Sequence, residues 1–168
     1  MSDVTLRPVR ASDHELLAKW LEEPAVRRTW GDPAEQLAFL RALPERYDHA
    51  LICADGSPVG YLRWALCDAE LLATVGAADL PAGLYDVDLF LGTESDRGRG
   101  AGPRALERLA VRLFDAGAPV LSLISHVSNA RAHRAFEKAG WTKDRPYRDD
   151  TFGDCWLFLR WAPGRAGR

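Results

Sequence analysis

The sequence lacks the long apolar runs and paired cysteines that mark membrane and secreted proteins. No stretch approaches the roughly 20 apolar residues of a spanning helix, and the first residues, Met-Ser-Asp-Val, do not have the basic and then apolar layout of a signal peptide. The three cysteines lie far apart without a CxxC pair, so we expect buried free thiols and neither disulfides nor zinc. These absences predict a cytoplasmic protein with no metal ion and no membrane partner.

A strong excess of charge is also absent. The net charge of −2 at pH 7 argues against a general nucleic-acid binder. The charges are segregated, however: residues 64–96 contain seven acidic residues and no Lys or Arg, and five arginines follow within residues 97–112. This pattern suits a protein that holds a cationic molecule beside an anionic one, although a solvated surface with chance segregation accounts for it equally well.

The hydrophobic pattern predicts one mixed α/β domain over residues 1–162, with a flexible tail at 163–168 and no internal repeat or linker. We expect the order β-α-α-β-β-β-α-β-α-β-β. Residues 22–32 are predicted to form a loop or broken helix, and residues 68–83 an irregular excursion. The expected strands cover 4–8, a hairpin over 49–67, 84–92, 119–125 and a final hairpin over 147–161; the expected helices follow residue 12, run over 33–43 and 103–116, and follow residue 128.

Local signals predict where several elements begin and turn. Ser12 and Glu15 have the spacing of a capping box, and Asp32 precedes Pro33 at the start of the next helix. Asp55-Gly56 is typical of a tight hairpin turn. Ser128 is expected to cap the last helix.

The stretch DRGRGAGPRALERL, residues 96–109, joins a strand to an amphipathic helix. Gly98, Gly100 and Gly102 permit positive φ and let backbone N–H groups approach a phosphate, while the helix start adds partial positive charge. A Walker loop is excluded because the glycines are followed by Pro-Arg instead of Lys-Ser/Thr, and GxGxG does not fit the GxGxxG dinucleotide fingerprint. The loop predicts an anion site, with a plain tight turn as the alternative.

Two motifs in this half of the chain resemble those of a known family. The first is Arg97-x-x-Gly100-x-Gly102 between a strand and a helix. The second is SNARAHRAFEKAGW, through Asn129, Ala132, Phe136, Lys138, Gly140 and Trp141. Together with the element order, they resemble the GCN5-related N-acetyltransferases (GNAT family), which implies a central mixed, mostly antiparallel sheet flanked by helices.

The resemblance implies acetyl-CoA as the co-substrate. The loop amides would bind its pyrophosphate, the loop arginines would add positive charge, Asn129 would hydrogen-bond the pantetheine arm, and a strand amide would stabilise the oxyanion. The cofactor-binding residues implied in this way are Leu89, Phe90, Leu91, Arg97, Gly98, Arg99, Gly100, Ala101, Gly102, Asn129 and Phe136.

For the acceptor, residues 4–31 with Trp20, Pro24, Val26 and Trp30, and the strand motif VDLFLG, are similar to aminoglycoside 6'-N-acetyltransferases. Residues 4–31 are also similar to siderophore-type hydroxylysine acyltransferases. The likeness implies Asp88 as the group that takes a proton from the substrate ammonium, with Trp30, Asp86 and Asp88 binding a cationic small-molecule amine. Because an ordinary Asp has a pKa of about 3.9, Asp88 needs burial beside Asp86 to act as a base, and otherwise chiefly orients the amine.

Three departures from the family pattern keep alternatives open. Phe136 stands where many members have a tyrosine that protonates the thiolate, Pro103 removes one N–H donor, and residues 123–125 lack the acid of the aminoglycoside enzymes. The alternatives are acylation of another amine (a siderophore hydroxylysine, a polyamine or a peptide N-terminus) and an acyl-CoA-binding domain with little turnover. We expect a monomer or a homodimer.

Overall fold

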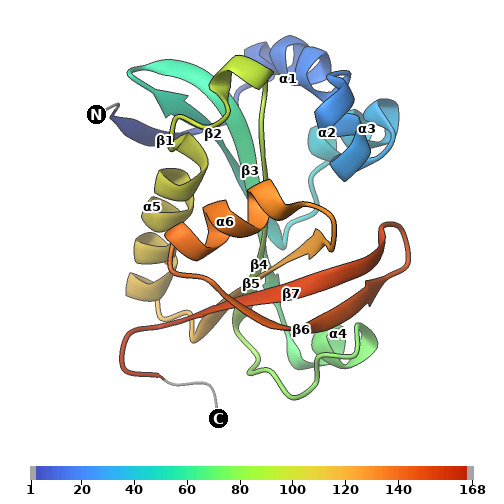
Figure 1. The fold of residues 1–168 in the computed structure, drawn as a ribbon, viewed down its shortest axis with the longest axis vertical. Helices are drawn as coiled ribbons and strands as arrows, with labels where there is room; N and C mark the ends of the chain where they lie inside the picture. The colour runs from blue at the N-terminus through green and yellow to red at the C-terminus, as the bar shows by residue number, and fades with distance from the viewer. Residues whose placement is uncertain (1–2, 166–168) are drawn as a thin grey trace. The chain divides into compact units, whose positions relative to one another are not determined.

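The computed structural model describes residues 3–165 and has the predicted mixed α/β fold (Figure 1). Seven strands form a mostly antiparallel sheet in the order β1-β2-β3-β4-β5-β7-β6, with β4 and β5 parallel. The strands are β1 (Val4–Pro8), β2 (Tyr47–Ala54), β3 (Ser57–Cys67), β4 (Leu84–Leu91), β5 (Val120–His126), β6 (Thr142–Asp149) and β7 (Gly153–Trp161). The helices are α1 (His14–Leu21), α2 (Pro24–Trp30), α3 (Pro33–Arg41), α4 (Ala69–Thr74), α5 (Ala101–Asp115) and α6 (Ala130–Lys138).

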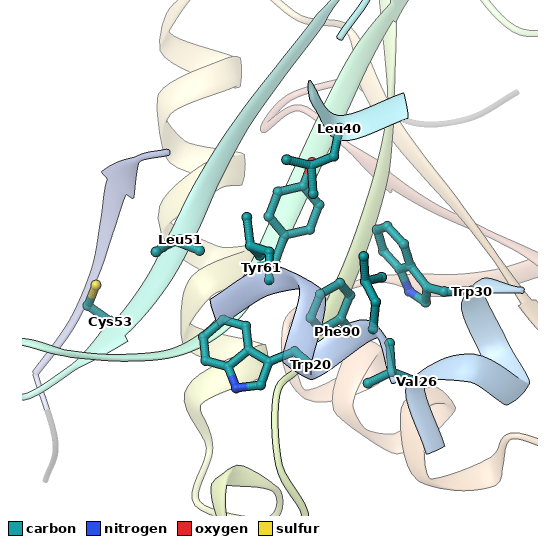
Figure 2. Packing of buried hydrophobic residues seen from close by; sticks show 10 residues of the cluster. Trp20, Val26, Trp30, Leu40, Leu51, Cys53, Tyr61 and Phe90 are labelled. Carbon is teal, nitrogen blue, oxygen red and sulfur yellow. The ribbon is translucent and has the colours of Figure 1, made fainter. Parts of the chain in front are cut away.

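The first of two compact units contains the residues up to Arg63 together with Leu89–Ala105. Its β2–β3 hairpin turns at Asp55 (φ 48°) and Gly56 (φ 81°), and two successive positive φ angles are the signature of the predicted tight turn. Helices α1–α3 cover β2, β3 and the end of β4 through one apolar cluster, in which Phe90 lies between Trp20 and Trp30 (Figure 2). Its buried members are Leu17, Trp20, Leu21, Val26, Trp30, Leu40, Leu51, Cys53, Tyr61 and Phe90.

The second unit contains Trp64–Asp88 and the residues from Leu106 on. The parallel pairing of β4 with β5 places Tyr85 opposite Leu121 and Asp86 opposite Ser122, and β7 is antiparallel to both β5 and β6. The predicted final hairpin is therefore confirmed. A second apolar cluster joins these strands to α4; its buried members are Cys67, Leu72, Ala77, Leu80, Leu84, Val120, Leu157 and Leu159.

Two segments outside the predicted regular elements contain helices: residues 22–32, predicted as a loop or broken helix, and residues 68–83, predicted to be irregular. α2 occupies most of 22–32, with Pro24 in its first turn, where a missing N–H costs nothing, and with Val26 and Trp30 buried. α4 lies within 68–83, capped by Asp68, whose carboxylate accepts from the Leu71 N–H at 2.8 Å. Both helices are too short to show a long apolar period, so packing of one or two buried side chains decides them.

Two of the three predicted helix caps are wrong in detail. The Ser12–Glu15 box does not form, because the Asp13 carboxylate instead binds the Arg7 guanidinium (2.8 and 2.9 Å) and the Arg10 N–H (2.7 Å) and folds residues 11–13 into a 3-10 turn before α1. α6 is capped by Asn129 and not by Ser128, whose hydroxyl bonds His126 Nδ1 at 2.7 Å. The Asp32 cap is confirmed, since its carboxylate accepts from the Ala34 and Glu35 N–H groups at 2.9 and 3.0 Å.

The remaining sequence expectations concern thiols, termini and membrane spans. Cys53, Cys67 and Cys155 are buried free thiols, as predicted. The expected tail begins in a turn closed by Arg165 N–H to Ala162 O at 3.0 Å, and residues 166–168 lie outside the described part. Between residues 3 and 165, no helix is both long and apolar enough to cross a bilayer.

Candidate functional site

The glycine-rich loop connects β4 to α5 through a 3-10 turn at Glu94–Asp96. Gly98 and Gly100 have φ angles of 79° and 82°, which confirms that the loop uses left-handed backbone that favours glycine. Gly102 lies within α5, and a Cβ there would make only an ordinary contact with Leu89 Cδ1 at 3.8 Å. The left-handed backbone is therefore confined to Gly98 and Gly100, and the positive φ expected at Gly102 is wrong because this residue is helical.

The start of α5 presents backbone donors. The helix begins at Ala101, two residues before the predicted Pro103, because glycine in the first turn does not prevent helical backbone. The Arg104 N–H bonds Gly100 O at 3.3 Å, so the amides of Ala101 and Gly102 come before the first bond of this helix, and Pro103 has no N–H to offer. Such amides, with the dipole of a 15-residue helix behind them, make an anion-binding end.

The two arginines of the loop are placed differently. Arg99 is exposed and lines a cavity of about 250 Å³ together with Asp96, Ala101 and residues of β1 and the β2–β3 hairpin. The Arg97 side chain is only 15% exposed. It bonds Glu94 Oε2 through Nη1 at 2.6 Å and the Leu91 carbonyl through Nη2 at 3.3 Å, so Arg97 is tied back toward β4.

The end of β4 is set into the aromatic part of the first unit's core. Phe90 is 6% exposed and lies edge-on to Trp20 and Trp30, with ring centroids 6.3 and 4.9 Å away; Figure 2 shows it between the two indoles. Trp30 is itself 8% exposed and also contacts Tyr61 and the Arg63 guanidinium, 5.8 and 4.6 Å away. Trp30 therefore has a core role, and lining a substrate pocket stays a prediction for it.

Arg63 is a residue that the sequence analysis missed. Its guanidinium lies over three rings, those of Trp30, Phe39 and Tyr47, at 4.6, 4.9 and 5.9 Å, and it approaches Gln36 Oε1 at 3.4 Å. The rings come from α2, α3 and β2, so no local pattern brings them together.

In the second unit, Asp86 has a specific hydrogen bond. The hydroxyl of Ser122, a 4% exposed residue, donates to Asp86 Oδ1 at 2.7 Å, across the β4–β5 pair. Asp88 is partly buried and lies on the same face of β4 as Asp86, because side chains alternate along a strand. Tyr147 is also near this face: burial, followed by the charges of Asp149 and Asp86, raises the pKa of its phenol.

The second motif lies on α6, which the sequence places correctly. Asn129 Oδ1 accepts from the Ala132 N–H at 3.3 Å, so Asn129 caps the helix. Phe136 is 7% exposed and lies edge-on to Phe158, 5.3 Å away. His133, one turn earlier on the same face, also contacts Phe158 and has Nε2 3.1 Å from His126 O. Burial lowers the pKa of His133, which keeps it neutral near pH 7.

Metal ligation finds no support in this region of the fold. Among residues 3–165, no group of three or more His, Cys, Asp or Glu side chains is arranged to hold a metal ion. The groups that could bind a ligand are the backbone amides and arginine of the loop, and the carboxylates on β4.

Comparison with known proteins assigns this arrangement to a family. A family model described as acetyltransferase (GNAT) domain matches residues 10–148. No curated protein matches the chain by sequence.

Several solved structures share the fold. The aminoglycoside acetyltransferase AAC(6')-Ib, in complex with coenzyme A and kanamycin, superposes with a TM-score of 0.81 at 22% identity over 95% of each chain. The aminoglycoside N(6')-acetyltransferase of Legionella pneumophila gives 0.77 at 16% identity over 95% of this chain and 92% of that one. Spermidine N-acetyltransferase of Vibrio cholerae, with CoA and spermine, gives 0.72 at 12% identity over 95% of each.

Proposed function

The chain belongs to the acetyltransferase (GNAT) family. We propose that it transfers the acetyl group of acetyl-CoA to a primary amine of a cationic small molecule, and that this amine is the 6'-amine of an aminoglycoside-type substrate. The observation that carries the proposal is the loop before α5, where Gly98 and Gly100 adopt positive φ and the helix amides of Ala101 and Gly102 face no intrahelical acceptor. This is a site for a phosphate-bearing ligand.

Different groups of the chain bind different parts of acetyl-CoA. The amides of residues 98–102 bind the pyrophosphate, and exposed Arg99 adds positive charge. Pro103 leaves this end one donor short. The cap of α6 uses only the carbonyl oxygen of Asn129, so its Nδ2 amide is the group that donates to a carbonyl of the pantetheine arm.

Transfer removes two protons from the nitrogen, one before it attacks and one as the amide forms, and adds one proton to the thiolate. Asp88 accepts a proton from the substrate ammonium, and the free amine forms a C–N bond to the thioester carbonyl carbon as the C–S bond breaks. An amide in the segment Leu89–Leu91 stabilises the oxyanion in between. Phe136 has no proton to give and His133 is buried and neutral, so a water molecule or the substrate protonates the thiolate.

The choice of acceptor rests on charge. Residues 64–96 are acidic without any Lys or Arg, and Asp86, fixed by Ser122 at 2.7 Å, lies on the same face of β4 as Asp88. Two carboxylates on one face of a strand suit a substrate with several ammonium groups. The aminoglycoside acetyltransferases of the same fold support this class, and the spermidine enzyme supports a polyamine as the second candidate.

A thiol-release assay over a panel of amines tests the proposal. We expect CoA release with kanamycin-type substrates; release only with spermidine or other amines would replace the acceptor class. CoA binding without turnover on any amine would contradict the enzymatic function and favour an acyl-CoA-binding domain, for which Phe136 is the main argument.

The role of Asp88 has its own test. Asp88→Asn should reduce turnover at least tenfold while acetyl-CoA affinity stays within twofold, because the carboxylate acts on the amine and not on the cofactor. Asp115→Asn, an exposed acid at the end of α5, serves as the matched control and should leave turnover unchanged. An unchanged rate for Asp88→Asn would remove that residue from the mechanism.

A further inference from the structure

We propose that Arg97 is a positioning residue: it clips the anion-binding loop to the end of β4, and the loop holds its binding shape because of this clip and not because Arg97 contacts phosphate. The inference rests on the proposed function for the identity of the ligand. It assigns direct charge contact with the phosphates to Arg99 and the backbone amides alone.

The Arg97 guanidinium is held by the strand and the turn that precede the loop. Its two terminal nitrogens are both used, Nη1 on Glu94 at 2.6 Å and Nη2 on the Leu91 carbonyl at 3.3 Å. The side chain is 15% exposed, against 73% for Glu94. The guanidinium is therefore largely covered, and its two terminal nitrogens link the strand to the turn before the loop. The planar guanidinium of arginine suits this double contact better than the ammonium of lysine.

The strand end to which Arg97 binds is rigid. Gly92, next to Leu91, donates its N–H to Val59 O at 2.9 Å and lies against the indole of Trp20, which a Cβ at this position would meet at 2.2–2.5 Å. Gly92 has no need of positive φ, so its smallness serves close packing alone. The Leu91 carbonyl is therefore fixed by the core of the first unit.

The turn between the end of β4 and the loop is closed by its own hydrogen bonds. The Thr93 N–H and hydroxyl bond Asp96 Oδ2 at 3.0 and 2.6 Å, closing a reciprocal cap around the 3-10 turn. Arg97 extends this closure from residue 96 back to Leu91. Every residue from Phe90 to Arg97 is thus held by the core, a backbone hydrogen bond or a side-chain hydrogen bond, including Ser95, whose hydroxyl lies 2.8 Å from Thr93 Oγ1, whereas the following glycines have the greatest backbone freedom of any residue.

Preorganisation is the expected result of the clip. A loop with two left-handed glycines loses conformational entropy when it orders around a phosphate, and a loop that is already ordered binds more tightly for the same contacts. Arg97 thereby affects affinity for coenzyme A through the loop amides, without adding a contact.

Calorimetry of coenzyme A binding distinguishes a clip from a direct phosphate contact by Arg97. The proteins compared are wild type, Arg97→Lys, Arg97→Gln and Glu94→Gln. A clip predicts that Arg97→Lys, which keeps the charge but loses the fork, weakens binding about tenfold, within twofold of Arg97→Gln. It also predicts that Glu94→Gln weakens binding about threefold, although removal of an acid makes the protein more attractive to an anion.

A direct phosphate contact predicts the opposite pattern. Arg97→Lys would then bind within about threefold of wild type, because lysine also binds phosphate as a point charge, and Glu94→Gln would bind more tightly. Either result overturns the clip. Arg27→Lys, in the exposed ion pair with Glu22 at 3.5 Å, is the matched control and should bind like wild type.

Hydrogen exchange in the ligand-free proteins supplies a readout that does not depend on the ligand. The amides of Gly98–Gly102 should exchange at least threefold faster in Arg97→Lys and Glu94→Gln than in wild type, while those of the β2–β3 hairpin stay unchanged. Equal exchange at the loop would refute the clip. Failure of the wild-type protein to bind coenzyme A would instead refute the proposed function, and the exchange result would still decide the clip.

Discussion

Gly92→Ala should be among the most destabilising single-methyl changes in this chain. Gly92 follows β4, and an ideal Cβ there would lie 2.2 Å from Trp20 Cε2, 2.3 Å from Nε1 and 2.5 Å from Cδ2. Restoring an ordinary contact of 3.4 Å requires the indole or the strand end to move by about 1.2 Å. Trp20 is 5% exposed and sits within the aromatic cluster of Figure 2, so neither partner can move without disturbing Phe90.

The size of the effect follows from two opposing terms. Overpacking a close-packed core costs about 1–3 kcal/mol, and a clash with a rigid ring belongs at the upper end. Alanine also lowers the conformational entropy of the unfolded chain, which stabilises the folded state by about 0.4–1 kcal/mol. This gain applies because the backbone at Gly92 is not left-handed and alanine can adopt it. We therefore expect the free energy of unfolding to fall by about 2 kcal/mol.

Urea denaturation measures this loss, and a double-mutant cycle identifies its cause. Trp20→Phe removes the ring atoms nearest the new methyl group, so Gly92→Ala should cost at least about 1 kcal/mol less in the Trp20→Phe background than in wild type. Gly102→Ala is the control: its Cβ meets only Leu89 Cδ1 at 3.8 Å, and helix propensity should leave stability equal or raise it by up to about 1 kcal/mol. Additive effects of Gly92→Ala and Trp20→Phe would refute the packing argument.

Three further changes test other parts of the structure. Gly100→Ala forces a Cβ onto a φ of 82°; we expect a loss of about 1–2 kcal/mol in urea and at least tenfold weaker coenzyme A binding by calorimetry, and unchanged binding would remove the loop from the site. The bond to Arg7 lowers the pKa of Asp13. Asp13 therefore stabilises the fold above the unfolded pKa of about 3.9 and loses this effect as pH falls through its folded pKa. The difference in the free energy of unfolding between wild type and Asp13→Asn should shrink from pH 6 to pH 3, and a constant difference would contradict the assignment. Arg63→Met should lower the free energy of unfolding by about 1–2 kcal/mol, because it removes the cation from three ring faces; an unchanged midpoint in urea would show that the stacking contributes nothing.

Local chemistry explains the features that could be predicted from the sequence. The Asp55–Gly56 turn, the Asp32 cap and the left-handed Gly98 and Gly100 each depend on a few consecutive residues whose φ angles or hydrogen bonds have few solutions. The same holds for the strand, loop and helix that carry the first motif, which is why the family could be identified before the fold was known.

Competition between neighbouring groups explains the two helix caps that were predicted wrongly. Ser12 and Ser128 are residue types that often cap helices. Near Ser12, however, the Asp13 carboxylate binds Arg7 and the Arg10 N–H and sets the local turn. At the other helix, Asn129 accepts the N–H bond instead of Ser128. A capping pattern names the residue types that can accept an N–H group. Which of two adjacent residues does so depends on partners elsewhere in the chain.

The sequence by itself determined the family, the order of the strands and of the longer helices, and the loop that offers amides to a phosphate, because these follow from short-range backbone preferences and from spaced motifs. Only the tertiary structure decided that Trp20 lies on Gly92, that three rings surround Arg63 and that Arg97 turns back to Leu91 instead of outward. The first two contacts join residues far apart in the chain, and all three depend on which side chains the packed core brings within a few ångströms. No local pattern encodes that.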